Sequence, residues 1–265
     1  MHPILFKIPV PPLLQPYFGS AIPIYTYAFL IVAGAVMACS YIKHHCKKKL
    51  GITVSNTFFY SAFFLGYVGG KVLFFLENPS YYFVHPFKVF SFGGGFVIYG
   101  SLLFIAVYTY WYARKKNINV YSFLDIVSVA SLQTMSLGRL GCYFGGCCYG
   151  KPTLFFTGLS YPTTAGLQHI HPVQLYDAFI LAVLFVALHR FLRHKIFAGQ
   201  VFIYFICLYA FERFILEFFR GDFRGSLFNG TLSHAQAIGI VTFCCSALLY
   251  HKLYKQTFKN LSVIK

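Results

Sequence analysis

The segment GRLGCYFGGCCYG, from Gly138 to Gly150, joins one arginine, five glycines and three cysteines at the end of a long apolar run. Arg139 in this segment would lie at membrane depth. An unpaired guanidinium is costly there, so it usually faces a partner or a polar cavity. Glycines allow one backbone to approach another backbone, or a ligand, closely. The segment therefore predicts either a reaction site or a tightly packed bend.

A second polar group occurs in the apolar run YAFERFILEFFR. Tyr209, Arg213, Glu217 and Arg220 are spaced by three or four residues, so they share one face of a helix. One interpretation is an ion pair that holds helices together. The other is a charged cavity wall, because two arginines against one glutamate leave surplus positive charge that suits a phosphate. With Arg139, three guanidiniums could hold a phosphodiester through planar, bidentate contacts.

Other candidates stand alone in their apolar runs. Lys71 follows a glycine pair and is either a second cavity cation or a partner for Glu77. Tyr27 and Tyr99 are either hydroxyl donors or interfacial aromatics. The motif HPVQLYD begins at His171, and its proline suits the first turn of a helix. His171, Gln174 and Asp177 would then lie close together around that turn.

The three clustered cysteines do not match a known metal-binding pattern. Cys142, Cys147 and Cys148 have the spacing C-x4-C-C, and no second Cys/His pair stands at ligand spacing. The spacing therefore predicts no metal site. A disulfide and simple packing of small residues both remain open.

Composition indicates the elements that must position these residues. The chain has 265 residues, of which 58% are hydrophobic and only 11% charged, far below the charged share of about 25% usual in soluble domains. We expect one all-α, polytopic integral membrane domain over residues 1–265. The formal net charge of +16 lies in short clusters between apolar runs, which is typical of cytoplasmic loops and argues against nucleic-acid binding.

Seven apolar runs are near the roughly 20 residues that a bilayer core requires. They are Ile22 to Tyr41, Thr57 to Leu76, Phe92 to Trp111, Ser122 to Gly141, Pro172 to Phe191, Gly199 to Phe218, and Ser233 to His251. Every second connection is basic, which predicts an outer N-terminus and a cytoplasmic C-terminus. The connections at residues 77–95, 142–171 and 220–231 would then face outward.

In order along the chain, these motifs resemble the prolipoprotein diacylglyceryl transferases of bacterial inner membranes. The resemblance covers nearly the whole chain. Its matching elements are Tyr27, GGK at Gly69 to Lys71, Tyr99-Gly100, GRLG at Gly138 to Gly141, Gly150, HPVQLYD, YAFERFILEFFR, and the Ser233/Gln236 pattern that opens the last span.

The resemblance implies that a diacylglyceryl group moves from phosphatidylglycerol to the lipobox cysteine thiol of a preprolipoprotein, without a cofactor. It places the site near the outer leaflet and open sideways to membrane lipid. We predict catalytic roles for Tyr27, Tyr99, Arg139, His171, Arg213 and Glu217. We predict substrate-binding roles for Lys71, Arg139, Cys142, Cys147, Gly150, Tyr209, Arg213 and Arg220.

The chain departs from the family pattern GRxGNFxNxExxG in its cysteines. Cys142 stands at the asparagine and Cys147 at the glutamate, and Tyr99 replaces the histidine that is favoured as the base. A thiol with a pKa near 8.5 needs a base or an electropositive setting, and His171 is our candidate for the base.

Two other function classes remain as alternatives. Cys142, Cys147 and Cys148 could serve a membrane thiol oxidoreductase. The buried arginines would also suit a transporter or flippase of an anionic lipid, although we find no pair of related halves of the kind many transporters have.

Overall fold

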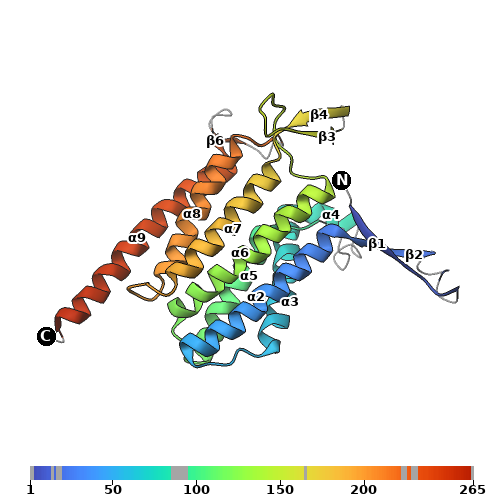
Figure 1. The fold of residues 1–265 in the computed structure, drawn as a ribbon. Coiled ribbons are helices and arrows are strands. Elements are labelled where there is room, and N and C mark those ends of the chain that lie inside the picture. Colours follow the sequence, from blue (N-terminus) through green and yellow to red (C-terminus); the bar gives the residue numbers. More distant parts are fainter. Residues whose placement is uncertain are drawn as a thin grey trace. The chain divides into compact units, whose positions relative to one another are not determined.

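The computed structural model describes residues 3–12, 15, 20–84, 95–163, 166–221, 226–227 and 232–263. In this part of the chain seven long helices follow one another (Figure 1). They are α2 (Thr26–Leu50), α3 (Asn56–Glu77), α5 (Ile98–Lys115), α6 (Val120–Gly145), α7 (Val173–Phe191), α8 (Gln200–Glu217) and α9 (His234–Val263). Each overlaps one of the seven predicted apolar spans, and a short helix α4 (Pro79–Val84) follows α3.

Five of these helices are long and apolar enough to cross a membrane: α2, α3, α6, α7, and α9 over His234–Thr257. The prediction of an all-α membrane protein is confirmed to that extent. Helix α8 carries Glu212, Arg213 and Glu217, and α5 ends in Arg114 and Lys115, which makes both less apolar. Their membrane crossing and the orientation of the chain stay predictions.

The connections contain short antiparallel hairpins that composition does not predict. Strands β1 (Ile4–Pro9) and β2 (Ala21–Tyr25) pair before α2, and β3 (Leu159–Thr163) and β4 (Gly166–Ile170) pair within the expected outer loop. Strands β5 (Ser226–Leu227) and β6 (Leu232–Ser233) pair before α9. The rest of the three expected outer connections includes residues 85–94, 164–165, 222–225 and 228–231, which lie outside the described residues.

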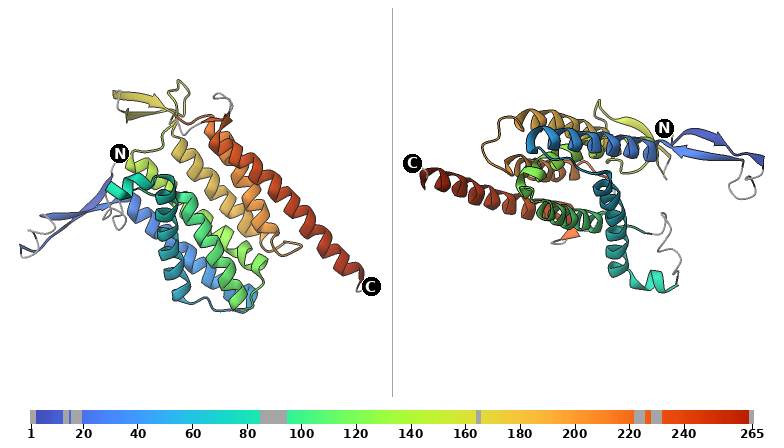
Figure 2. Two further views of the ribbon diagram at one scale, coloured as in Figure 1. Left: turned by 180° about the vertical axis from the view of Figure 1, so that it is seen from behind. Right: turned by 90° about the horizontal axis from the view of Figure 1, so that it is seen from below.

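The chain forms two compact units, and the expected single domain over residues 1–265 stays a prediction. Unit 1 comprises residues 1–42 and 124–265, and unit 2 comprises residues 43–123. In unit 1, α8 lies between α7 and α9 (Figures 1 and 2). The Ser136 hydroxyl of α6 donates a hydrogen bond to the Ala178 carbonyl of α7 at 2.8 Å.

A buried carboxylate fixes the start of α8 in unit 1. Asp125 of α6 is fully buried and accepts the backbone N–H groups of Gly199 at 2.9 Å and Phe202 at 2.8 Å. The ammonium of Lys195 lies 2.7 Å from the same carboxylate. An anion is favourable at this position because the first N–H groups of a helix lack intrahelical partners and carry the positive end of its dipole.

Glycines set the close packing of unit 2. A side chain at Gly69 of α3 would collide with the Gly100 carbonyl, and one at Gly100 of α5 would collide with the Gly69 carbonyl. The two backbones therefore touch directly, as small residues permit in membrane helices. At the other end, Phe58 packs against Tyr112 and Phe123, with ring centroids 4.5 and 5.7 Å apart.

Candidate functional site

Asp177 in the second turn of α7 joins two of the predicted arginines. Its Oδ2 atom lies 2.7 Å from Nε of Arg139 on α6 and 3.3 Å from Nη1 of Arg213 on α8. Asp177 is 1% exposed, so this carboxylate is held almost entirely by protein groups. A buried charge requires such partners, because its desolvation is costly when it is unpaired. Three helices of unit 1 therefore meet at one carboxylate.

The polar face predicted on α8 continues this network. Arg213 reaches Glu217 one turn further along, with Nη2 and Oε2 3.7 Å apart. Tyr209, one turn earlier, interacts electrostatically with Arg139 and Arg213. The predicted helical face is confirmed for Arg213 and Glu217, which form an i,i+4 ion pair, and Arg213 uses two different nitrogens for two carboxylates. The prediction is wrong for Arg220, because α8 ends at Glu217 and Arg220 lies in a β-bridge beyond it.

At Gly150 the backbones of three segments of the chain are in contact. Its N–H donates to the His171 carbonyl at 3.0 Å, and it forms an antiparallel bridge with Arg220. A Cβ atom at Gly150 would lie 2.6 Å from the His171 carbonyl oxygen and 2.7 Å from that of Phe219. Glycine is therefore required here for backbone packing, and the predicted role of Gly150 in substrate binding stays a prediction.

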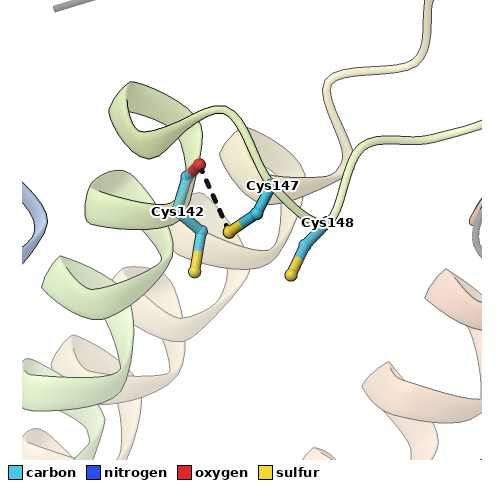
Figure 3. Close-up of side chains that lie close together, drawn as sticks. All are labelled: Cys142, Cys147 and Cys148. Atoms are coloured by element: carbon cyan, nitrogen blue, oxygen red, sulfur yellow. Dashed lines mark hydrogen bonds between the residues drawn. The ribbon is translucent and has the colours of Figure 1, made fainter. Parts of the chain in front are cut away.

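A helix-ending turn places two of the cysteines together. Gly146 has φ of 78°, its N–H donates to the Tyr143 carbonyl, and the N–H of Cys147 donates to the Cys142 carbonyl. This is the Schellman motif, in which a left-handed glycine reverses the chain at the end of a helix. It returns Cys147 toward Cys142 at the last turns of α6 (Figure 3).

Cys148 connects the cysteines to the third arginine. It has a positive φ of 63°, which is uncommon for a residue other than glycine. Hydrogen bonds from the thiols of Cys142 and Cys147, and from the guanidinium of Arg220, lower the pKa of the Cys148 thiol although burial opposes this shift. Arg139 also interacts electrostatically with Cys142 and Cys148. The three cysteines and the predicted arginines thus belong to one site.

Tyr27 of α2 joins this site from the opposite side of α6. A Cβ atom at Gly141 would lie 3.0 Å from the Tyr27 ring and 3.1 Å from its Cα atom, so the two helices touch at this glycine. Tyr27 interacts electrostatically with the three cysteines and with Arg139. The structure therefore brings Tyr27 together with the GRLG motif.

His171 lies beside Gly150, whose N–H donates to its carbonyl, just before α7 begins. Its Nδ1 atom is 3.3 Å from the Tyr176 hydroxyl, and its ring packs edge-on against Phe219 with centroids 5.3 Å apart. Among the described residues no hydrogen bond joins its imidazole to Asp177. His171 is thus beside the arginine network through its backbone, and its role as the base stays a prediction.

Lys71 and Tyr99 belong to unit 2. Lys71 on α3 is buried, and its ammonium lies 5.8 Å from the centroid of the Tyr67 ring. Tyr99 in the first turn of α5 is half exposed. Gly93 and Gly94 of the glycine run before it lie outside the described residues. The predicted site roles of Lys71 and Tyr99 stay predictions.

Glu212 was not predicted from the sequence as part of this site. Gln174 and Asp177 were expected beside His171, and Cys148 within the cysteine cluster, but none of the three was given a catalytic or substrate-binding role in the transferase. Gln174 is 2% exposed and donates to the Cys147 carbonyl at 2.6 Å. Glu212 is 5% exposed and lies beside Asp177, with which it interacts directly. The available signal was the rarity of acidic residues, of which the chain has only six, so that each one inside an apolar run is a candidate.

The arrangement suits an anionic ligand. Arg139, Arg213 and Arg220 supply three positive charges, and Asp177 and Glu217 balance two of them. The ion pair of Arg139 with Asp177 is made through Nε of Arg139, at 2.7 Å. A guanidinium fixed through one edge presents the other in a planar fork that matches a phosphate.

A family model described as prolipoprotein diacylglyceryl transferase matches residues 17–252. The chain belongs to this family. Similar proteins named phosphatidylglycerol–prolipoprotein diacylglyceryl transferase occur in Clostridium tetani, at 31% identity over 95% of this chain and 97% of the relative, and in Geobacter sulfurreducens, at 37% identity over 66% and 67%. A relative from Clostridium perfringens, which carries the same name with the number 2, is 29% identical over 86% of this chain and 90% of its own length.

Family membership confirms the resemblance seen in the GRLG, HPVQLYD and YAFERFILEFFR motifs. It makes the chain a transferase, and with its apolar helices the chain is a bacterial membrane protein. Asp177, Arg139 and Arg213, which the structure joins, come from these three motifs.

Proposed function

We propose that this transferase moves the diacylglyceryl group of phosphatidylglycerol to the cysteine thiol of a lipobox in a preprolipoprotein. The thiol sulfur attacks the glycerol carbon that carries the phosphate, a C–S bond forms, and the C–O bond to the phosphate breaks. The thiol proton goes to a base, and glycerol phosphate leaves. The products are a thioether-linked diacylglyceryl protein and glycerol phosphate.

The observation that carries this proposal is the convergence of Arg139 and Arg213 on one buried oxygen of Asp177. Negative charge accumulates on the phosphate as the C–O bond breaks, and guanidiniums fixed in advance stabilise it without reorganisation. Asp177 acts as a positioning residue because it sets the directions of both arginines. Arg220, held by the bridge to Gly150, supplies a third positive charge.

The proton acceptor is His171 in this proposal. Its Nδ1 atom faces the Tyr176 hydroxyl, so Nε2 is the atom that takes the proton. Tyr27, which reaches the cysteines and Arg139 from α2, supplies a hydroxyl donor beside the phosphate.

The site faces the outer leaflet of the bacterial inner membrane in this proposal. The N-terminus is outside, the C-terminus is cytoplasmic, and α5 and α8 complete seven spans. The support is the alternation of basic connections along the chain, since short lysine- and arginine-rich loops are retained in the cytoplasm. Reporter fusions at residue 116 and at the C-terminus should both report a cytoplasmic location, and an external signal from either would overturn this orientation.

Transfer is tested with the purified full chain in vesicles that contain phosphatidylglycerol, together with a lipobox peptide. The expected result is a peptide whose mass increases by one diacylglyceryl group. The variant Arg139→Gln should lose this activity, whereas Arg114→Gln, at an exposed arginine at the end of α5, should retain it. Absence of the mass increase, under conditions in which the Clostridium tetani relative modifies the same peptide, would refute the proposal for these substrates.

A further inference from the structure

The thiols of Cys142, Cys147 and Cys148 lie close together, with that of Cys147 directed toward Cys142 (Figure 3). Their three Sγ atoms all lie within 4.8 Å of one another. A metal ion bound to thiolates at about 2.3 Å places its sulfur ligands roughly 3.8–4.0 Å apart. The observed spacing needs only small side-chain rotations to meet this requirement. The spacing C-x4-C-C predicted no metal site. The fold nevertheless brings the three sulfur atoms close enough together to bind one ion.

The backbone conformations of Gly146 and Cys148 bring the three thiols together. The Schellman motif at Gly146 brings Cys147 back over Cys142, and the left-handed conformation of Cys148 turns the next thiol to the same point. Gln174 of α7 holds the Cys147 carbonyl from the other side at 2.6 Å. A site whose ligands are positioned before binding loses little conformational entropy when the ion enters.

Two positively charged side chains adjoin the cysteine cluster. Arg139 interacts with Cys142 and Cys148, and Arg220 donates a hydrogen bond to Cys148. Three thiolates carry three negative charges, and a bound monovalent or divalent cation leaves two or one of them uncompensated. The nearby guanidiniums of Arg139 and Arg220 reduce the electrostatic cost of that remaining negative charge.

The donor set selects the kind of ion. Sulfur ligands favour soft or borderline ions such as Cu(I) and Zn²⁺ over Mg²⁺ or Ca²⁺, which require oxygen. In the described part of the chain no histidine or carboxylate joins the three thiols as a fourth ligand. Three sulfurs are a complete set for Cu(I), and Zn²⁺ would add a water on the side of Cys147, which is exposed.

We propose that Cys142, Cys147 and Cys148 form a three-thiolate binding site for one thiophilic metal ion, Cu(I) or Zn²⁺. The site adjoins Arg139 and Arg220, but the proposal does not depend on lipid transfer. A chain that binds the ion and transfers no lipid would retract only the function proposed above.

The test uses the full chain, purified in detergent, fully reduced and freed of metal. Zn²⁺ and Cu(I) are added in separate titrations against competing chelators, and bound metal is measured by mass spectrometry. One ion per chain is expected, and the ion that binds more tightly identifies the preferred occupant. Co²⁺ serves as a spectroscopic probe, because its thiolate complexes have sulfur-to-metal charge-transfer bands.

Each of Cys142→Ser, Cys147→Ser and Cys148→Ser should weaken binding by at least the roughly 10–100-fold that loss of an outer-shell partner typically costs. Cys244→Ser and Cys245→Ser, at two exposed cysteines of α9, are the matched controls and should leave binding unchanged. Circular dichroism confirms that each variant is folded. Binding of less than one ion per reduced chain would overturn the proposal, as would stoichiometric binding that survives all three substitutions in the cluster.

Discussion

Arg139 and Asp177 form a 2.7 Å ion pair that joins the GRLG motif of α6 to the HPVQLYD motif of α7. The same oxygen of Asp177 accepts Arg213 from α8, so one carboxylate orients two arginines from different helices. This relationship accounts for the acidic residue among the arginines of the proposed phosphate site. Without it, two long and flexible side chains of like charge would repel each other and lose their common direction.

Replacing Asp177 with asparagine tests this positioning role. Asp177→Asn keeps the shape of the side chain but removes the charge that both guanidiniums face. We expect kcat for diacylglyceryl transfer to fall by on the order of 10²-fold, since a misplacement of about 1 Å at a reacting centre costs that much. The measurement is the initial rate of peptide modification over a range of phosphatidylglycerol concentrations.

Asp177→Glu is the control for charge, because it retains the carboxylate on a longer side chain. It should recover part of the activity lost in Asp177→Asn. If Asp177→Asn transferred lipid at the rate of the unmodified chain, the ion pairs would be structural and the proposed positioning role would be wrong.

The close backbone packing around Gly150 predicts that one added methyl group will lower the stability of the fold markedly. In Gly150→Ala the new Cβ would collide with the carbonyl oxygens of His171 and Phe219, which are backbone atoms and cannot rotate away. We expect a loss of about 1–3 kcal/mol in the free energy of unfolding, as overpacking typically costs. Thermal unfolding in detergent measures it.

Gly138→Ala is the matched control for this substitution. Gly138 lies within α6, and the nearest atom to its Cβ would be Ile31 Cγ1 at 3.9 Å, an ordinary contact. Alanine also favours a helix over glycine by about 1 kcal/mol. Gly138→Ala should therefore be neutral or stabilising, and equal destabilisation of the two variants would contradict the packing argument.

The buried carboxylate of Asp125 should contribute strongly to the free energy of unfolding. Asp125→Asn removes the ion pair with Lys195 and weakens the bonds to the N–H groups at the start of α8. We expect a cost of about 1–3 kcal/mol in unfolding free energy, because the amide keeps only one acceptor oxygen and one of the two N–H donors loses its partner. Chemical denaturation in micelles gives the value.

Lys195→Gln should cost less than Asp125→Asn, because the ammonium is partly exposed and the two backbone donors still bind Asp125. A larger effect of Lys195→Gln than of Asp125→Asn would show that the ion pair, and not the helix start, accounts for the stability.

Hydropathy located the helices well and their ends less well. The predicted span from Pro172 to Phe191 matches α7, because proline marks the first turn. The predicted span from Ile22 to Tyr41 differs from α2, which begins at Thr26. Residues 21–25 form a strand with β1, and a short apolar run does not distinguish a strand from the start of a helix. Helix α2 also continues through its lysines to Leu50, since lysine is a good helix former.

The site was predictable where its contacts are local. The pairing of Arg213 with Glu217 follows from a separation of four residues on one helix. The pairing of Arg139 with Asp177 links residues 38 positions apart, and no local pattern specifies it. The cysteine cluster depends on the conformation of Gly146, and the Cys spacing alone gave no reason to expect three converging thiols.

If His171 is the base, replacing it should lower the transfer rate near neutral pH, and alkaline pH should restore much of that rate. His171→Gln removes the proton acceptor but keeps a side chain of similar size beside Gly150. We expect the transfer rate near neutral pH to fall by roughly 10²–10⁴-fold, the usual contribution of a general base. Above a pH of about 8.5 the lipobox thiol ionises on its own, so the variant should regain much of its rate.

Glu212→Gln provides the comparison for this experiment, because Glu212 is a buried carboxyl group of unit 1 that lies beside Asp177 in the arginine network. If His171 is the base, Glu212→Gln should change the rate by less than about 10-fold, which is below the contribution of a general base. A deep loss in Glu212→Gln that alkaline pH relieves, beside an active His171→Gln, would transfer the role of base to Glu212. Equal losses in His171→Gln at neutral and alkaline pH would instead indicate that His171 acts only through packing against Phe219 and Tyr176.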